Sequence, residues 1–273
     1  MRTLDAGSLP LLDAVAALEA ALAELDPETE PVRTIMPVGD GELLVMPAAA
    51  GRHAAVKLVT VGPGEPRVQG VCVLFDAATL SPVALLDGIA LTNLRTPALS
   101  ALAVRRLAAP DARRLVVFGR GPQARAHADA IRAVRPIEHV ELLGRDARRR
   151  DELVAAADVV CCCTTAREPL FDGGLVADHA CVVAIGSHEP AARETDDALA
   201  ARATVVVEAR ASALREAGDV IAAIEAGVLA AADLLTLRDL VLGASVPPGP
   251  RLFKSTGMAW EDAVVAAAVH ERG

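Results

Sequence analysis

The spacing of hydrophobic residues predicts a definite order of helices and strands. Leucine and valine recur at helical intervals between residues 11 and 25, so a helix opens the chain and ends at Asp26-Pro27. From residue 42 to residue 86 the pattern changes to short apolar runs such as ELLVMP, AAVKLVTV and RVQGVCVLFD, separated by Gly and Pro. These runs predict a mainly antiparallel sheet, and residues 94–107 predict a helix after it.

The second half of the chain alternates fully apolar runs with helical segments. The runs are LVVFG, HVELLG, DVVCCCTT, CVVAIG and TVVVEA, and helices are expected at 122–134 and 145–157. Strands that are apolar on both faces predict a parallel sheet covered by helices on both sides. The expected fold class is therefore α/β, with a Rossmann-type doubly wound parallel sheet beside a smaller α+β domain.

Two breaks in the pattern mark the expected domain boundaries. Pro110-Asp111 separates the two halves, and the Pro/Gly-rich stretch at 243–250 precedes a closing helix. We expect residues 1–110 together with 251–273 to form the smaller domain, and residues 111–250 to form the parallel one.

Composition excludes several classes of function. A hydrophobic fraction of 53% and a formal charge of -9 indicate a soluble acidic protein, so neither nucleic acid nor an anionic membrane is an expected partner. No apolar run reaches the roughly 18 to 20 residues of a membrane span, and Asp5 and Asp13 stand where a signal peptide would be apolar, so the expected location is the cytoplasm. The consecutive Cys161, Cys162 and Cys163 do not have metal-ligand spacing. We interpret them as small core residues and expect no metal site.

A glycine-rich turn follows the first apolar run of the second half. Gly119, Gly121 and Ala124 form G-x-G-x-x-A directly after a strand and at the start of a helix. The two glycines allow a tight turn and the close approach of a pyrophosphate, and the N-terminus of the helix favours an anion. This arrangement predicts a dinucleotide site; the alternative is merely a tight strand–helix turn.

The residues after the next strand indicate which dinucleotide is bound. The chain reads Gly144-Arg145-Asp146 there. An arginine suits the 2′-phosphate of NADP(H), whereas an acidic residue binds the ribose 2′-hydroxyl of NAD(H). Arg145 favours NADP(H), and Asp146 keeps NAD(H) possible. The alternative is that Arg145 is an exposed arginine at a strand end with no role in nucleotide binding.

Three cations of the first half, Arg33, Lys57 and Arg95, have no obvious partners in the sequence. Lys57 and Lys254 are the only lysines among 27 basic residues, which suggests positions where a guanidinium will not serve. Lys57 lies inside the apolar run VKLV, and a buried ammonium must meet either a carboxylate or a ligand anion. A small carboxylate substrate would satisfy all three cations, and ordinary salt bridges are the alternative.

Taken together, the motifs of both halves resemble those of the ornithine cyclodeaminase and mu-crystallin family. The resemblance runs through nearly the whole chain in order. It rests on Arg33, Met46-Pro47, Lys57 with LVTV, Gln69-Gly70, Leu86-Asp87-Gly88, Thr92 with Arg95-Thr96, VVFGRGPQARAH and FKSTGMAWED.

The resemblance implies a role for each domain. The smaller domain would bind substrate and form a homodimer, and the nicotinamide would lie at the cleft between the domains. Arg33, Lys57 and Arg95 would bind the substrate carboxylate, and Lys57 would also exchange a proton. The expected cofactor contacts are Thr96, Gly119, Gly121, Pro122, Gln123, Ala124 and Arg145, with Ser255 approaching the nicotinamide.

The chain departs from the family pattern at three places. The cyclodeaminase has an aspartate in the segment that reads AIGSHEPAARETD here, where this chain has His188 and Glu189. The stretch from 146 to 160 is short, as if one strand–helix unit were missing, and Leu80 stands where the family usually has glycine. His188 is a second candidate for proton transfer near neutral pH, and a surface-loop histidine is its alternative.

The leading hypothesis is an NAD(P)H-dependent oxidoreductase that acts on a small cyclic imino acid or amino acid, such as a ketimine reductase or an amino-acid dehydrogenase. One alternative is deamination of the ornithine cyclodeaminase type with bound NAD. The other is a catalytically silent, mu-crystallin-like binding protein.

Overall fold

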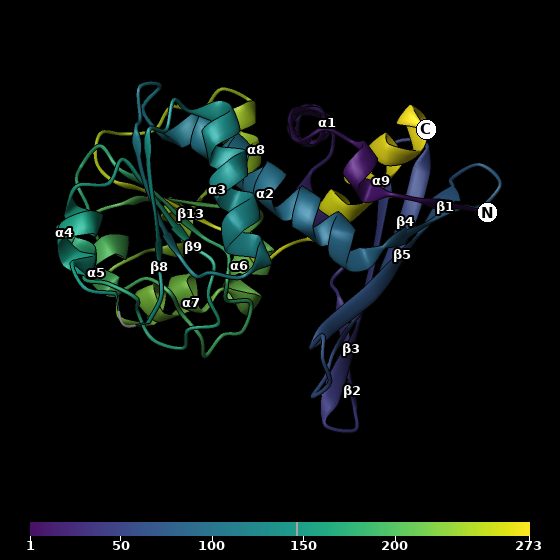
Figure 1. Ribbon diagram of the computed structural model, residues 1–273, viewed down its shortest axis with the longest axis horizontal. Helices are drawn as coiled ribbons and strands as arrows, with labels where there is room; N and C mark the ends of the chain where they lie inside the picture. Colours follow the sequence, from purple (N-terminus) through teal and green to yellow (C-terminus); the bar gives the residue numbers. More distant parts are fainter. Residues whose placement is uncertain (146) are drawn as a thin grey trace. The chain divides into compact units, whose positions relative to one another are not determined.

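The computed structural model describes residues 1–145 and 147–273, which form two compact units (Figure 1). Unit 1 comprises Met1–Leu99 with Met258–Gly273, and unit 2 comprises Ser100–Gly257. The expected boundaries at 110/111 and 250/251 differ from these. Helix α2 (Gly88–Leu107) contains the observed boundary between Leu99 and Ser100. Strand β13 (Arg251–Lys254) pairs with strands of unit 2, so it belongs to unit 2 and not to unit 1.

Unit 1 is built on a six-stranded sheet in the order β1-β6-β5-β4-β3-β2. The pairs from β2 to β6 are antiparallel, as the short apolar runs predict, and β1 adds to β6 in parallel. The strands are β1 (Arg2–Leu4), β2 (Thr34–Val38), β3 (Gly41–Ala50), β4 (His53–Val61), β5 (Val68–Asp76) and β6 (Pro82–Asp87). The unit also contains α1 (Leu11–Glu24), α9 (Ala259–Arg272) and the short 3₁₀ turns Ala6–Ser8 and Pro27–Thr29.

Helix α9 covers one face of this sheet and packs on β3, β4 and β5 (Figure 1). Side chains of a strand alternate between its two faces, and in β4 the positions Ala55, Lys57 and Val59 are buried while Val56 and Leu58 between them are only partly buried. The inward row of an apolar strand therefore carries an ammonium group. This placement leaves Lys57 only 2% exposed.

Helix α2 begins six residues earlier than the pattern predicts, at Gly88 instead of residue 94. The Asp87 carboxylate accepts hydrogen bonds from the backbone N–H groups of Ile89 and Ala90, both 2.8 Å long, and so caps the first turn. The segment TNLRTP is helical as a result. It places Arg95 and Thr96 on the buried side of the helix.

Unit 2 contains a seven-stranded, entirely parallel sheet in the order β12-β11-β13-β10-β9-β7-β8, which confirms the predicted doubly wound fold. Its strands are β7 (Arg114–Phe118), β8 (His139–Leu143), β9 (Val159–Cys162), β10 (Cys181–Ala184), β11 (Thr204–Val207), β12 (Leu235–Thr236) and β13. Its helices are α3 (Pro122–Val134), α4 (Arg150–Ala155), α5 (Asp197–Ala200), α6 (Arg210–Glu216), α7 (Gly218–Glu225) and α8 (Leu237–Val241), with 3₁₀ turns at Gly173–Leu175 and Ala231–Asp233.

The side of the sheet beyond β7 is shorter than in a full Rossmann domain. The common order is 3-2-1-4-5-6, with two strands beyond the first, whereas here β8 is the edge strand among the described residues. This agrees with the predicted loss of one strand–helix unit. Helix α4 is also shorter than the expected 145–157, because Arg149 adopts a left-handed conformation with φ of 64° directly before it.

Leu80 lies in the turn between β5 and β6 of unit 1, with φ of 55° and 71% of its surface exposed. Glycine adopts a left-handed backbone without strain. This backbone conformation therefore explains why the family pattern has glycine at the position of Leu80. None of the described helices is long and apolar enough to cross a membrane.

Candidate active site

The centre of the site in unit 1 is the ammonium group of Lys57. It lies 2.7 Å from Oδ2 of Asp262 and donates a hydrogen bond of 2.9 Å to Oδ1 of the same carboxylate. It also donates to Oγ1 of Thr92 at 3.3 Å, and Thr92 in turn donates to the carbonyl of Gly88. Only 2% of Lys57 is exposed, so this pair is shielded from solvent.

Arg95 joins the same network from helix α2. Its Nε donates to Oδ1 of Asp262 at 3.2 Å, and its Nη1 donates to Oε2 of Glu261 at 2.5 Å. The other oxygen of Glu261 accepts the backbone N–H of Met258 and so caps helix α9. Two cations from β4 and α2 thus converge on two adjacent carboxylates at the start of α9.

The network changes the acidity of Lys57. Burial and the neighbouring Arg95 guanidinium disfavour the charged amine, and the Asp262 carboxylate only partly offsets them, so the pKa of Lys57 falls to about 8 from an ordinary value of 10.5. An amine with a pKa in this range can both donate and accept a proton near neutral pH. The sequence predicts that a carboxylate or a ligand anion meets the buried ammonium. In the structure this group is the carboxylate of Asp262.

Sequence reasoning did not single out Glu261 and Asp262, although both lie within the FKSTGMAWED motif. The available signal was an acidic pair at a predicted helix start in a chain with a buried lysine. The structure brings two of the predicted substrate cations, Lys57 and Arg95, together on Asp262. Arg33 is a partly buried residue just before β2.

The candidate nucleotide site of unit 2 lies where the order of the sheet reverses. β8 is on one side of β7 and β9 on the other, so the loops after β7 and β9 separate at their carboxyl ends. A cavity of about 440 Å³ opens there, between the glycine turn, the end of β8 and the loop after β9. Its lining residues are Phe118, Gly119, Arg120, Leu143, Gly144, Arg145, Arg150, Cys163, Thr164, Thr165, Ala166 and Leu170.

The glycine turn has the shape that a pyrophosphate requires. Gly119 has φ of 116°, and a Cβ atom there would lie 2.6 Å from the carbonyl oxygen of Cys163. A Cβ atom on Gly121 would meet no atom within 4 Å, so the space above the start of α3 is open. Pro122 begins α3 and Ala124 is fully buried, which lets the helix pack closely on the strand. The residues present therefore fit a dinucleotide phosphate.

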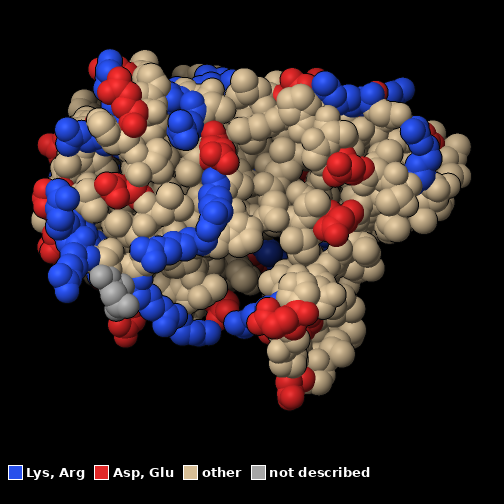
Figure 2. Space-filling model, viewed as in Figure 1, with Lys and Arg blue, Asp and Glu red and all other residues tan. Residues whose placement is uncertain are grey.

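The charge around this cavity is positive. Arg120, Arg145 and Arg150 line it, and the Arg120 guanidinium lies close enough to Gly144 that a Cβ atom there would be 3.3 Å from it. Asp146, which kept NAD(H) possible, lies outside the described residues. On the face in Figure 2, the arginines of unit 2 are interspersed with carboxylates and form no uniform basic surface.

Two further predicted cofactor contacts are buried or partly buried polar side chains. Thr96 is 8% exposed, and its hydroxyl has no hydrogen-bond partner among the described residues. Gln123 lies in the first turn of α3, where its backbone carbonyl accepts a hydrogen bond of 2.8 Å from the imidazole of His127. Polar groups buried in this way are normally satisfied, so the Thr96 hydroxyl is suited to a ligand.

The remaining two predicted site residues are His188 and Ser255. They follow β10 and β13, at the same carboxyl edge of the sheet. His188 is exposed on the loop after β10 and follows Ser187, which is buried. The ammonium of Lys254 donates to both the carbonyl and the hydroxyl of Ser187 at 2.8 Å and lies 3.0 Å from Asp219. Lys254, the second lysine of the chain, therefore anchors the loop that carries His188.

Asp219 and Glu208 hold these two loops in place. Burial alone would raise the pKa of Asp219, but Lys254 and backbone donors hold that pKa below its ordinary value. Glu208 accepts hydrogen bonds from the hydroxyl of Ser255 at 2.6 Å and from the backbone N–H groups of Thr256 and Gly257. The Ser255 side chain is thus oriented by a carboxylate, which the sequence did not reveal.

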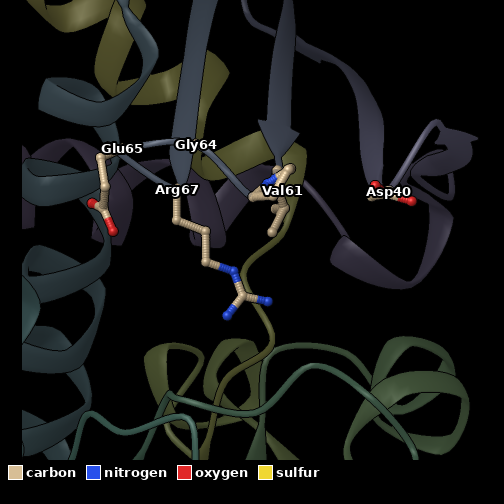
Figure 3. Close-up of a pocket in the computed structure, with 7 residues that line it drawn as sticks. Asp40, Val61, Gly64, Glu65 and Arg67 are labelled. Atoms are coloured by element: carbon tan, nitrogen blue, oxygen red, sulfur yellow. The ribbon is translucent and has the colours of Figure 1, made fainter.

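A smaller depression, of about 280 Å³, lies in unit 1 between Asp40 and the turn from Val61 to Arg67 (Figure 3). Its charged side chains, Asp40, Glu65 and Arg67, are exposed and point in different directions. This depression therefore lacks a buried group of ionisable side chains like the one around Lys57.

Comparison with known proteins agrees with this geometry. The family model for the ornithine cyclodeaminase/mu-crystallin family matches residues 6–155 and 147–273. The chain belongs to this family. Among curated members of the family, it is 33% identical over 288 residues to the ketimine reductase mu-crystallin of Mus musculus, covering 93% of this chain and 90% of that protein. It is also 33% identical over 278 residues to a Delta(1)-pyrroline-2-carboxylate reductase of Bacillus cereus, covering 89% and 85%.

Solved structures of the family share the whole fold. The Delta(1)-pyrroline-2-carboxylate reductase of Thermococcus litoralis, in complex with NADH and L-proline, superposes with a TM-score of 0.91 at 28% identity and covers 100% of this chain and 97% of its own. An archaeal alanine dehydrogenase dimer with bound NAD superposes with a TM-score of 0.88 at 25% identity, covering 98% and 94%. The expected family and fold class are confirmed.

The two glycines of the turn should respond differently to alanine. Gly121→Ala should leave the free energy of unfolding within about 0.5 kcal/mol of wild type, because the added methyl group meets open space, yet weaken nucleotide binding at least about tenfold by filling the phosphate position. Gly119→Ala should destabilise the protein by about 2 kcal/mol or more, because its backbone is left-handed and its Cβ would clash. Denaturant unfolding and nucleotide titration measure the two effects. Normal nucleotide affinity in Gly121→Ala would refute the assignment of the phosphate position.

Proposed function

We propose that this protein reduces a small cyclic imino acid to the corresponding amino acid with NAD(P)H. The observation that carries the proposal is the buried pair of Lys57 and Asp262, which holds an ionisable amine beside the Arg95 guanidinium. Relatives that are 33% identical to this chain are named ketimine and pyrroline-2-carboxylate reductases. The reverse reaction, oxidation of a simple amino acid, would use the same groups.

In this proposal the cations of unit 1 bind the substrate carboxylate. Arg95 and Lys57 supply N–H donors in a buried place, where Glu261 and Asp262 balance their charge, and Arg33 contributes from the connection before β2. An ammonium has three N–H groups, and Lys57 donates to two side chains, Asp262 and Thr92. The third N–H of Lys57 is the donor that we assign to the substrate.

Reduction of an imine requires a hydride at the α carbon and a proton at the nitrogen. The nicotinamide supplies the hydride when it is bound. Lys57 donates the proton, since its pKa of about 8 leaves it charged at neutral pH and ready to lose that charge. His188 is the second candidate donor, and the anchored Ser187 fixes its place after β10.

The glycine turn holds the nucleotide. Gly119, Gly121, Pro122, Gln123 and Ala124 surround the pyrophosphate, and the start of α3 contributes its partial positive charge. The hydroxyl of Thr96 binds a phosphate oxygen, and Ser255 borders the nicotinamide while Glu208 orients it. Arg145 binds the 2′-phosphate, so NADPH is the preferred reductant and NADH the poorer one.

We further propose that the protein works as a homodimer. Strand β2 exposes Ile35, Met36 and Val38, each between 46% and 54% accessible, along the edge of the sheet of unit 1. Exposed apolar residues grouped on an edge strand are a surface that a second copy can cover. A related alanine dehydrogenase is described as a dimer.

Replacement of Lys57 tests the catalytic assignment. Lys57→Ala should lower kcat for NADPH-dependent reduction of pyrroline-2-carboxylate at least about 100-fold, while the nucleotide Kd changes less than about twofold. In the wild type kcat should fall as pH rises through about 8, because the protonated donor is present below its pKa and lost above it. The matched control is Arg52→Ala, an exposed cation that should leave kcat within about twofold. Equal losses of kcat and nucleotide affinity in Lys57→Ala would contradict the role.

Replacement of Arg145 tests the cofactor preference. Arg145→Ala should raise the Kd of NADPH about tenfold, which is about 1.4 kcal/mol, and leave the Kd of NADH within about twofold. Arg132→Ala, in the last turn of α3, serves as the control and should change neither. Equal weakening of both nucleotides, or of neither, would show that Arg145 does not bind the 2′-phosphate.

A further inference from the structure

A cysteine–histidine cluster borders the nucleotide cavity of unit 2. The sulfur of Cys163, the residue after β9, lies 3.6 Å from the sulfur of Cys161, and a ring nitrogen of His127 lies within 4.8 Å of both sulfurs. His127 is fully buried in α3, and its Nε2 lies 2.9 Å from the hydroxyl of Ser100. Neither the proposed reaction nor the predicted cofactor contacts use this cluster.

Cys163 differs from the other cysteines in its access to the cavity. It is only partly buried and lines the cavity together with Gly119 and Arg145, whereas Cys72, Cys161, Cys162 and Cys181 are buried. The interpretation of all three consecutive cysteines as core residues is therefore wrong for Cys163, because β9 ends at Cys162 and the next residue is only partly buried and borders the cavity.

The surroundings favour the thiolate form of Cys163. The contact with the Cys161 thiol and the nearby His127 imidazole outweigh burial and lower the pKa of Cys163 to about 5. Burial alone would lower the pKa of His127, but the neighbouring Cys163 raises it. The thiolate and the imidazolium thus stabilise each other.

Other ionisable groups lie near this pair. Glu194 is buried, accepts hydrogen bonds from the backbone N–H and hydroxyl of Thr164, and has a pKa raised to about 7 by burial. The arginines that border the same cavity are Arg120, Arg145 and Arg150. Their positive field favours an anionic sulfur and attracts anionic ligands.

We propose that Cys163 is a modification site, at which the sulfur reacts with peroxides and other small soft electrophiles in the nucleotide cavity and thereby blocks nucleotide binding. The blocking part rests on the proposed function, since it requires that a nucleotide occupies this cavity. The site consists of Cys163 as nucleophile, with His127 and Cys161 as the groups that hold it ionised.

The reaction with a peroxide balances with the groups present. The Cys163 sulfur attacks one oxygen of hydrogen peroxide, an S–O bond forms and the O–O bond breaks. The sulfur is oxidised by two electrons to a sulfenic acid, and the peroxide is reduced to water with a proton from the His127 imidazolium. A thiol reductant reverses this step.

Modification at this point should exclude the nucleotide for a geometric reason. The carbonyl oxygen of Cys163 lies where a Cβ atom of Gly119 would clash, so the residue borders the turn that approaches the pyrophosphate. An added oxygen or carbamidomethyl group takes space in the cavity wall. Conversely, a bound nucleotide covers the sulfur and should protect it.

The test is alkylation of the intact protein with iodoacetamide, with the rate at each cysteine followed by peptide mass spectrometry. The rate at Cys163 should change less than about twofold between pH 6 and pH 8, because the thiolate is already formed at pH 6, whereas an ordinary thiol should speed up roughly 50- to 100-fold. Saturating NADPH should slow the reaction at Cys163 at least about tenfold. A rate at Cys163 that rises with pH like that of an ordinary thiol would overturn the proposal.

Variants separate the roles within the cluster. His127→Gln should restore a steep pH dependence at Cys163, and Cys181→Ser, a buried thiol outside the cavity, should leave the flat profile unchanged. After treatment with hydrogen peroxide, the wild type should lose nucleotide binding and recover it with dithiothreitol, whereas Cys163→Ser should keep the same binding before and after treatment. Loss of binding in Cys163→Ser after peroxide would overturn the assignment to Cys163.

The outcome also distinguishes this proposal from the proposed function. A flat pH profile at Cys163 without any binding of NADPH or NADH would support the reactive thiol and refute both its effect on nucleotide binding and the proposed function. Tight nucleotide binding and imine reduction with a slow, steeply pH-dependent Cys163 would support the proposed function and refute the modification site.

Discussion

The structure of unit 1 depends on the need to neutralise a buried ammonium group. Lys57 occupies an inward position of β4 that the strand pattern would give to an apolar residue, and its partner Asp262 lies 205 positions later in the chain. Removal of one partner from such a pair leaves an uncompensated buried charge, which typically costs about 3 to 5 kcal/mol. The start of α9 is therefore held on the sheet, and Arg95 is drawn to the same carboxylates.

The features that local sequence determines could be predicted, and those that depend on packing could not. The turn from Gly119 to Ala124 follows from adjacent residues, because a strand, two glycines and a helix start lie within a few positions. The inward position of Lys57 follows from alternation in one strand. Its partner does not, because only the docking of α9 on the sheet brings Asp262 beside it.

Element ends were the least predictable features, and one of them has a chemical consequence. The apolar run through Cys161 and Cys162 indicates a buried strand, but it does not indicate that the strand ends before Cys163. Likewise, the side-chain cap from Asp87 starts α2 at Gly88, six residues before the predicted start. At the end of β9, a shift of one residue decides whether a cysteine belongs to the buried strand or borders the cavity.

The most direct measurement of the central claim is a titration of the Lys57 amine by nuclear magnetic resonance of protein labelled only at lysine. The chain has two lysines, so the two side-chain signals can be assigned with a Lys57→Arg variant. Burial and the neighbouring Arg95, which Asp262 only partly offsets, predict a pKa of about 8 for Lys57. A signal that stays protonated up to the ordinary value of 10.5 would show that the amine is not held in this environment and would contradict its role as proton donor.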